Sequence, residues 1–380
     1  WEEALATAAD GLRRAAGRGP VMVAGGGRLS CEDGYLLQAL AREVLKSPHV
    51  DMAPVGGARA LVEGVWDVFD RPCSSAGFDE IRQADFVLVF GSDPGRSHPL
   101  VKTELVQAAV QRRVPVIVAN PVAGGLDRHA VDVLRLTPGS VNDLLSGVAA
   151  RLMVLESTSA HRIENLPGYD AWRQSVEAFS PESIRRATRI AGETVDRLAL
   201  GLAAARRPVL VMGTGSGVPG DEAAVARAAS ALTALLGSDA GLLVLGGRSN
   251  VQGLVDVGLH PRILPGHRLV GQAVELEDLT GRATLSEEGW TVSQWVAAGP
   301  EAASGLLLVG VDPVDLLPRG EDPRRVLEGA NFCVVVDAFL TSTAQRANVV
   351  LPAAILSERE GTTVGADGVR RRIRQALDPP

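Results

Sequence analysis

Cysteine is scarce in this chain. There are only three, Cys31, Cys73 and Cys333, and no two of them form a CxxC pair. Such scattered thiols do not build a disulfide framework, so a reducing, cytosolic setting is expected. An iron–sulfur cluster needs about four clustered thiolates, which these residues cannot supply. The sequence therefore excludes both a disulfide-stapled fold and a cluster housed within these 380 residues.

Long hydrophobic runs and an excess of positive charge are also missing. The longest apolar stretches, such as FVLVF and GLLLVGV, have the length of strands, far below the roughly 18 residues that a membrane span needs. The formal net charge of −7 argues against a nucleic-acid surface, because phosphate binding requires clustered basic residues. The basic run RRRIRQ at residues 370–375 predicts a solvated helix face, with a binding patch as the alternative. We therefore expect neither nucleic acid as a partner nor direct membrane insertion.

The chain begins at Trp1, directly in the helical pattern WEEALATAADGLRRAA, without an initiator methionine, signal peptide or transit peptide. We therefore expect it to be a piece of a longer polypeptide. Its 380 residues are enough for two or three domains, each with its own hydrophobic core.

The chain is rich in a recurring unit, a buried strand followed by an amphipathic helix. Runs of Val, Ile and Leu end in Gly or Pro and lead into helical patterns, as expected for a parallel sheet with helices on both faces. Two such units resemble each other, at residues 19–45 and 207–237, and two further strands end in G-x-D-P, at 91–94 and 310–313. Residues 152–205 are mostly helical in pattern. We expect an α/β fold of two doubly wound, Rossmann-like lobes, with a cleft at the carboxyl ends of their strands.

Two glycine-rich turns are candidate binding loops. Residues 215–220 spell G-x-G-x-x-G after a strand, but Pro219 stands where helix amides should meet a pyrophosphate, and no acidic residue follows the next strand. A tight turn is therefore the better interpretation there than a dinucleotide site. The glycines at 25–27 form the matching turn of the first unit, which either binds an anion or only reverses the chain.

Other catalytic signals are weak. His260 and His267 have no carboxylate or thiolate beside them at metal-ligand spacing, so no metal site is predicted from them. Neither a P-loop nor a G-x-S-x-G nucleophile elbow is present, which excludes the nucleotide hydrolysis and serine hydrolysis that depend on them.

The stretch NVQGLVDVGLHPRILPG, at residues 250–266, has the pattern of an irregular loop inside a compact domain, and such loops are usually functional. It resembles the N-x-Q-G-x-x-D-x-G-x-x-P-x-x-L-P-G segment of formate-dehydrogenase-like proteins in the molybdopterin oxidoreductase superfamily. The matching residues are Asn250, Gln252, Gly253, Asp256, Gly258, Pro261, Leu264, Pro265 and Gly266. Similar blocks run from WEEAL at the start to NFCVVVDAFLTSTAQRANVVLPAAILSEREGTTVGADG near the end, so the resemblance covers the whole chain.

The resemblance carries expectations about domains and cofactors. In that superfamily two α/β lobes hold a bis-dinucleotide molybdopterin, and a [4Fe–4S] domain precedes them. The resemblance therefore implies a [4Fe–4S] cluster upstream of Trp1. It also implies a discontinuous α/β lobe of residues 1–57 plus 206–380 and an inserted lobe of residues 58–205, with a helical linker at about 152–205. Both halves of the discontinuous lobe would then contribute strands to one sheet.

The sequence departs from the family pattern where the cofactor would be held. Catalytic members carry Cys or selenocysteine at a position that falls within residues 49–61, which contain no cysteine. The D-P-R motif is replaced by N-P-V at 120–122, Val141 replaces the Asp of P-G-T-D, and Gly365 and Val369 replace an Asn and an Arg. Each change removes a charge, a ligand or a hydrogen-bonding group, and an unpaired buried group costs about 1–3 kcal/mol. We therefore expect that the two lobes no longer bind a pterin.

A retained fold with a dismantled site resembles one branch of the superfamily, the large iron–sulfur subunit (the G subunit) of bacterial NADH-quinone oxidoreductase. The resemblance implies a scaffold without a catalytic residue, without a cofactor of its own, and with other subunits of a respiratory complex as partners. It also implies a place in the peripheral arm on the cytoplasmic face of the membrane. On this hypothesis the segment at 250–266 is retained because it wedges the two lobes together.

Two alternatives stay open. One is a catalytic molybdenum or tungsten enzyme related to formate dehydrogenase, with molybdopterin guanine dinucleotide bound and Asp51 as the metal ligand. The other is a non-enzymatic module that binds a small ligand in the cleft. The cleft residues inherited by analogy are Gly25, Gly27, Gly91, Asp93, Asn120, Asn250, Gln252 and Gly253.

Overall fold

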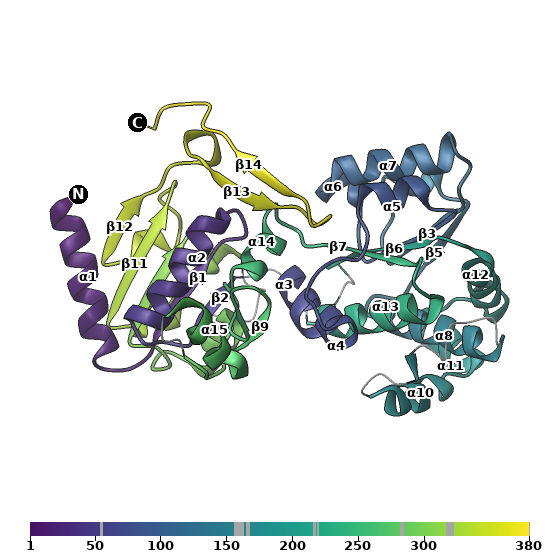
Figure 1. Ribbon diagram of the computed structural model, residues 1–380, viewed down its shortest axis with the longest axis horizontal. Helices are drawn as coiled ribbons and strands as arrows, with labels where there is room; N and C mark the ends of the chain where they lie inside the picture. Colours follow the sequence, from purple (N-terminus) through teal and green to yellow (C-terminus); the bar gives the residue numbers. More distant parts are fainter. Residues whose placement is uncertain are drawn as a thin grey trace. The chain divides into compact units, whose positions relative to one another are not determined.

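The computed structural model describes residues 1–53, 56–155, 163, 164, 168–215, 218, 220–281, 285–316 and 323–379. The chain forms two compact units: unit 1 comprises residues 1–58, 248–365 and 369–380, and unit 2 comprises residues 59–247 and 366–368. Each unit contains a five-stranded parallel sheet between helices (Figure 1). The expected α/β class with mainly parallel sheets is confirmed.

Unit 1 is built on strands in the order β12-β11-β10-β1-β2. Their bounds are β1 (Val21–Gly25), β2 (Val50–Met52), β10 (Gly305–Val309), β11 (Phe332–Asp337) and β12 (Val349–Pro352). The central strands β1 and β10 carry only apolar residues and glycine, because helices cover both faces of this parallel sheet. One face packs on α1 (Glu2–Ala16) and α2 (Cys31–Ala39), and the other on α16 (Val292–Ala298) and α18 (Pro323–Gly329).

Unit 2 repeats this architecture with strands in the order β5-β4-β3-β6-β7. Their bounds are β3 (Phe86–Phe90), β4 (Val116–Asn120), β5 (Asp132–Arg135), β6 (Pro208–Gly213) and β7 (Gly241–Leu245). Helices α5 (Phe78–Gln83) and α7 (Pro99–Val110) cover one face. Helices α12 (Gly192–Ala204) and α13 (Glu222–Leu236) cover the other, and α8 (Val141–Val154) packs on both of them.

Shorter elements complete the two units. The helices are α3 (Gly56–Ala60), α4 (Trp66–Phe69), α6 (Pro94–Ser97), α10 (Tyr169–Glu177), α11 (Pro181–Thr188), α14 (Val251–Asp256), α15 (Ala273–Thr280) and α17 (Pro313–Leu316), and the π-helical turns are η1 (Leu40–Val44) and η2 (Leu61–Val65). The 3₁₀ turns are η3 (Asp127–His129), η4 (Val270–Gln272), η5 (Ala344–Arg346) and η6 (Leu356–Glu358). Two antiparallel hairpins pair β8 (Ile263–Leu264) with β9 (Arg268–Leu269), and β13 (Gly361–Val364) with β14 (Arg370–Ile373).

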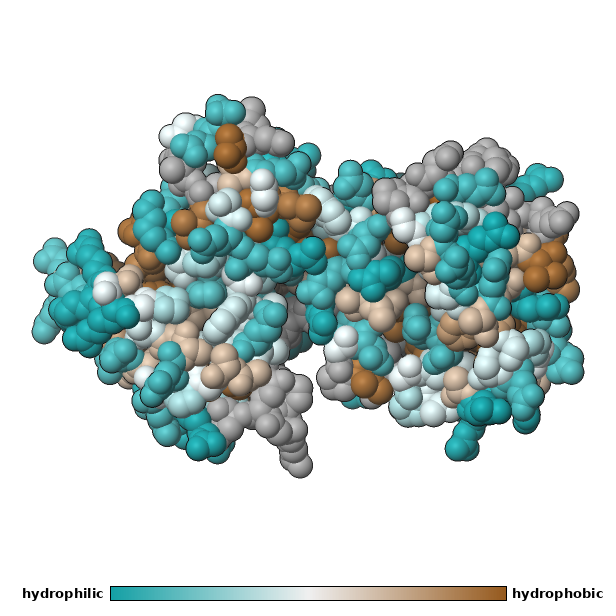
Figure 2. All heavy atoms as spheres, turned by 90° about the horizontal axis from the view of Figure 1, so that it is seen from below, coloured by the Kyte–Doolittle hydropathy of each residue, from teal (hydrophilic) through white to brown (hydrophobic). Residues whose placement is uncertain are grey.

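Within the described residues, no helix combines the length and the apolar character needed to cross a bilayer. On the face seen in Figure 2, hydrophobic residues form small groups among hydrophilic ones. Scattered exposed apolar side chains of this kind are normal for a protein surface in water.

The boundary of the discontinuous lobe differs from the expected one. Residues 206–247 are expected beside residues 1–57, but the structure places them in unit 2. The reason is that β6 pairs with β3 along its length, from Phe86↔Pro208 to Phe90↔Met212. The two similar strand–glycine–helix units at 19–45 and 207–237 therefore contribute to different sheets.

Two local expectations are also wrong. The helices within residues 152–205 are not a linker: α11 and α12 pack against α8 inside unit 2. The basic run at 370–375 does not form a helix but supplies strand β14, which pairs with β13. Pairing with a neighbouring strand outweighs the helical propensity of arginine here.

The segment at 250–266 is more regular than the sequence indicates, and a buried cation holds it. It begins with helix α14, and its end supplies β8, which pairs with β9 just beyond the segment. Between them the guanidinium of Arg42, only 1% exposed, donates to the carbonyls of Gly258 (2.8 Å), His260 (2.6 Å) and Ile263 (3.3 Å). Burial lowers the pKa of Arg42 to about 10, so the side chain still carries its charge at neutral pH. One side chain thus supplies a donor to three carbonyls of this segment.

Replacement of Arg42 by Met should destabilise the protein by about 2–4 kcal/mol, since each buried carbonyl left without a donor costs about 1–3 kcal/mol. Urea unfolding of the two proteins measures the difference. The matched control is Arg13→Met, because the Arg13 side chain is 72% exposed in a surface ion pair with Asp10 and should contribute less than about 0.5 kcal/mol. Equal losses in the two variants would contradict the bracing role of Arg42.

His260 makes unit 1 sensitive to acid. Burial, followed by the charges of Arg262 and Arg42, lowers its pKa to about 3, so it is neutral in the fold and charged in the unfolded chain below its ordinary pKa. Stability is then lost as pH falls from about 6.5 toward 3, at up to about 1.4 kcal/mol per pH unit. The variant His260→Asn keeps an acceptor for the Arg262 N–H. It should flatten the decline of unfolding free energy between about pH 6.5 and 4, whereas an unchanged slope would exclude His260 as its source.

Candidate functional site

The carboxyl edge of the unit 1 sheet has the geometry of a ligand crevice. From β1 the chain continues outward to β2 on one side, while β10 lies on its other side and leads outward to β11 and β12. The connections therefore diverge between β1 and β10. In doubly wound folds ligands bind at this topological switch point, beyond the carboxyl ends of the strands.

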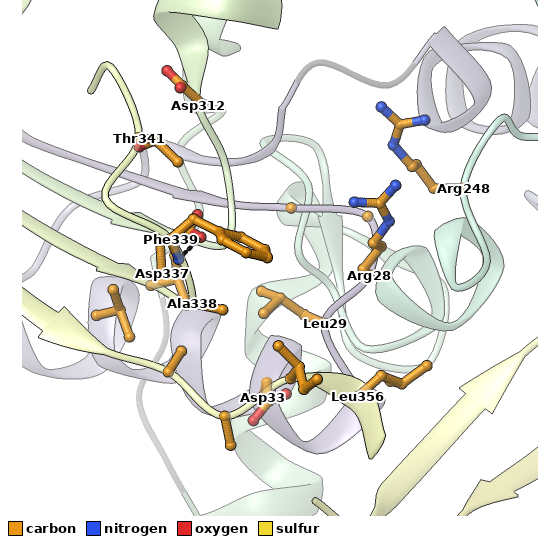
Figure 3. A pocket seen from close by; sticks show the side chains of 18 of the residues that line it. Arg28, Leu29, Asp33, Arg248, Asp312, Asp337, Ala338, Phe339, Thr341 and Leu356 are labelled. Carbon is orange, nitrogen blue, oxygen red and sulfur yellow. Dashed lines mark hydrogen bonds between the residues drawn. The ribbon is translucent and has the colours of Figure 1, made fainter. Parts of the chain in front are cut away.

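A cavity of about 780 Å³ lies at this point (Figure 3). Its walls come from the turns after β1 and β10, with Gly26, Gly27 and Gly310, and from the segments after β11 and β12. Gly26 is required by packing, because a Cβ there would lie 1.9 Å from the carbonyl oxygen of Gly310. The absence of a side chain lets the ends of the two central strands approach each other at the floor of the cavity.

The charged side chains that line this cavity differ in whether they have hydrogen-bond partners within the protein. Asp337 accepts from the Phe339 N–H (3.0 Å), and Asp312 accepts from Thr343 Oγ1 and the Val314 N–H. The Arg28 guanidinium, in contrast, donates to no group within the described part of the chain. Figure 3 shows Arg28 and Arg248 on the same side of the cavity, away from Asp312. That side suits an anionic group, while the exposed Phe339 ring offers an apolar face.

Asn250 is the centre of the predicted site residues in unit 1. Its side chain is fully buried, donates from Nδ2 to the Leu29 carbonyl (2.7 Å) and accepts at Oδ1 from the Val364 N–H (2.7 Å). Its backbone N–H donates to the Gly27 carbonyl (3.2 Å). The amide therefore ties the turn that lines the cavity to the start of α14 and to strand β13.

The other predicted residues of unit 1 pack around this amide. A Cβ on Gly253 would lie 2.2 Å from Asn250 Oδ1, so glycine is needed for the close contact. Gln252 donates to Asp256 Oδ1 (2.7 Å), which His267 Nε2 also contacts (2.7 Å). Gly25 faces the side chains of Leu29, Leu37 and Leu259, so its environment is apolar. Of the five predicted residues in unit 1, only Gly27 lines the cavity.

The predicted residues of unit 2 meet at the carboxyl ends of β3 and β4. Gly91, with a φ of +61°, accepts at its carbonyl from the Gly215 N–H (2.8 Å). The side chain of Asn120 accepts from the Ser92 N–H (3.2 Å) and donates to the Ser92 carbonyl (2.7 Å). Asp93 caps α6 and accepts from the N–H groups of Gly95 (3.1 Å) and Gly125 (3.3 Å). These side chains close turns within unit 2. Gly217 and Pro219 of the G-x-G-x-x-G motif lie outside the described residues.

Asp51, the candidate metal ligand under one alternative, has a structural environment. It is 8% exposed on β2, and its Oδ2 accepts a hydrogen bond of 2.8 Å from the Val292 N–H at the first turn of α16. It does not line the cavity. In the described portion of the chain, no three His, Cys, Asp or Glu side chains are grouped as a metal site requires.

Sequence reasoning missed the arginines that line the cavity. Arg28 and Arg248 each follow a glycine pair after a strand, in GGGR and GGR. That pattern could have identified both, because the position after a glycine turn at a strand end faces the crevice. Phe339 and Arg359 carry no comparable local signal, since the distant strands β11 and β12 bring them to the cavity.

Replacing Asn250 by Asp tests the central amide. The variant keeps the acceptor for Val364 but loses the donor to Leu29, and it places a carboxylate oxygen against that carbonyl. We expect a loss of about 2–3 kcal/mol in unfolding free energy. Asn348→Asp is the matched control, because Asn348 is exposed and its side-chain oxygen accepts from the Cys333 N–H, an interaction that Asp retains. Similar stabilities for the two variants would refute the assigned role of Asn250.

Comparisons with known proteins agree with this architecture. The chain is 31% identical over 358 residues to F420-dependent formate dehydrogenase 2 subunit alpha of Methanococcus maripaludis, covering 92% of this chain and 52% of the relative. It is 30% identical over 395 residues to the second G subunit of NADH-quinone oxidoreductase of Rhizobium meliloti, covering 100% of this chain and 43% of the relative. The chain thus spans about half the length of the curated relatives it matches.

A solved structure shares the fold at lower sequence identity. Acetylene hydratase from Pelobacter acetylenicus superposes with a TM-score of 0.71 at 14% identity, covering 100% of this chain and 56% of the hydratase chain. The sequence profile of the family described as Molybdopterin oxidoreductase matches residues 1–380. Since that match extends over the entire sequence, the chain belongs to the molybdopterin oxidoreductase family.

Proposed function

We propose that this chain is the scaffold region of the large iron–sulfur subunit of an NADH-quinone oxidoreductase and that it holds no pterin. The observation that carries the proposal is that side chains predicted from the resemblance to hold the cofactor bond instead to the protein's own backbone. Asn120 and Asn250 each direct both polar side-chain atoms to neighbouring backbone groups. Polar groups engaged in this way brace loops and are not presented to a ligand.

The position expected to bind the metal supports the same proposal. Among the described residues at 49–61, Asp51 is the one carboxylate that could substitute for a cysteine ligand. Its carboxylate binds the Val292 N–H, and releasing it would leave a buried donor unpaired at a cost of about 1–3 kcal/mol. The residues present therefore do not fit a pterin-bound metal centre, and no redox step is assigned to them.

The positions that depart from the family pattern also lack groups for a dinucleotide. Val122 is 74% exposed, and Val141 is fully buried at the start of α8. Gly365 donates to the Val369 carbonyl (3.1 Å) and closes the β13–β14 hairpin. An aliphatic side chain or a turn glycine offers no charge to a phosphate and no side-chain hydrogen bond to a guanine.

In the proposed role the chain positions other parts of the large iron–sulfur subunit. Electrons would pass through clusters held elsewhere in the longer polypeptide, and these two units would contact further subunits of the complex. The peripheral arm on the cytoplasmic face of the membrane is the place proposed for it. The identity of 30% to a G subunit of NADH-quinone oxidoreductase, across 100% of the chain, supports this assignment.

A formate-dehydrogenase-like enzyme is the second candidate, favoured by the 31% identity to a formate dehydrogenase alpha subunit. On this alternative the cavity of about 780 Å³ would hold part of a molybdopterin guanine dinucleotide, with Arg28 and Arg248 near its phosphates. The metal would require a ligand other than the engaged Asp51 carboxylate.

Metal analysis of the full-length protein, purified in its native assembly, separates the two candidates. We expect iron in stoichiometric amount and neither molybdenum nor tungsten, because the Asp51 carboxylate already accepts from the Val292 N–H. We also expect NADH-dependent quinone reduction by the assembly and no formate-dependent dye reduction. A stoichiometric pterin in the denatured extract would overturn the proposal and establish the second candidate.

A further inference from the structure

The β13–β14 hairpin has two outer edges, and the edge of β13 is closed by side chains. The Thr362 N–H donates to Glu32 Oε2 (2.8 Å), and the Val364 N–H donates to Asn250 Oδ1 (2.7 Å). These alternate residues point their backbone groups away from β14, as the hairpin register requires. No further strand can pair with this edge while Glu32 and Asn250 occupy its donors.

The outer edge of β14 is open. In the hairpin register Gly361 and Thr363, whose backbone groups face β14, lie opposite Ile373 and Arg371. Backbone groups alternate in direction along a strand, so those of Arg370 and Arg372 point away from β13. In the part of the chain that the structure describes, β14 pairs with β13 alone. An unpaired row of N–H and C=O groups is a template for another strand.

The side chains on this edge select the charge of such a strand. Arg370, Arg371, Arg372 and Arg374 are all exposed, and Arg372, with a side chain 65% exposed, forms a surface ion pair with Glu360 (3.1 Å). A hollow of about 460 Å³ beside the hairpin is lined by Arg370, Arg371 and Arg372 together with Glu32 and Glu360. Arginines directly opposite arginines are repulsive, so a second copy of β14 is disfavoured and an acidic strand is favoured.

We propose that the outer edge of β14 binds an acidic, extended segment of another protein chain as a third strand of this sheet. Backbone hydrogen bonds to Arg370 and Arg372 would give the pairing, and the arginine side chains would select carboxylates on alternate residues of the partner. The inference concerns this edge alone and does not depend on the proposed function.

Peptide binding to the full-length protein tests the proposal. The probe is a fluorescent peptide of about eight residues alternating Glu and Val, a typical strand length, compared with one alternating Lys and Val. Measured by fluorescence anisotropy, the acidic peptide should bind at least roughly tenfold more tightly than the basic one. Its affinity should fall as the salt concentration rises from about 0.05 to 0.5 M. Equal affinity for the two peptides, or binding of neither, would overturn the proposal.

Two substitutions at one position separate strand pairing from charge attraction. Arg372→Gln removes one charge and should weaken binding by about threefold. Arg372→Pro also removes the outward N–H while leaving the pairing with β13 intact, and should weaken binding by about a further fivefold to tenfold. Arg13→Gln, an exposed arginine on α1, serves as the control and should leave binding unchanged.

Three results would count against the proposal. Equal effects of the Gln and Pro variants would show charge attraction without strand pairing. A loss of binding in Arg13→Gln would show a nonspecific charge effect. Self-association of the protein that Arg372→Pro abolishes would show that a second copy occupies the edge.

Discussion

The buried amide of Asn250 is the interaction on which unit 1 most depends. It joins three segments that are far apart in the sequence: the turn after β1 at Leu29, the start of α14, and strand β13 at Val364. A buried side-chain amide needs hydrogen-bond partners for both its nitrogen and its oxygen. Only one arrangement of the three segments provides these partners for Asn250. This side chain fixes one wall of the cavity and, together with Glu32, closes the outer edge of β13.

Arg42 performs the complementary task on the other end of the same segment. It donates to the carbonyls of Gly258, His260 and Ile263 and so braces the irregular residues between α14 and β8. Asn250 and Arg42 together explain why a glycine- and proline-rich stretch is ordered inside the core. Both side chains act within unit 1, so the role of this stretch in joining the two lobes stays a hypothesis.

The sequence predicts the repeated elements of this fold well and their assignment to sheets poorly. Apolar runs such as those of β1, β3 and β10 identify strands, because a strand covered by helices on both faces requires apolar residues along its whole length. Which strands pair is decided by contacts across long separations, and for this reason the lobe bounds inferred from the resemblance assign β6 to the wrong lobe. The same limit applies to the site: Asn250 and Gly253 are visible in a motif, whereas Phe339 and Arg359 reach the cavity only through tertiary structure.

The interrupted path of the chain has a consequence for synthesis on the ribosome. The five-stranded sheet of unit 2 has all its strands once residue 245 has been made, whereas that of unit 1 gains β10 only at residue 309 and is complete only at residue 352. Strands β1 and β2 must therefore wait with apolar surface uncovered while a complete α/β body folds behind them. The stretch that carries β1 and β2 needs shielding during that interval. The folded inserted body then shortens the distance across which the separated parts of unit 1 must meet.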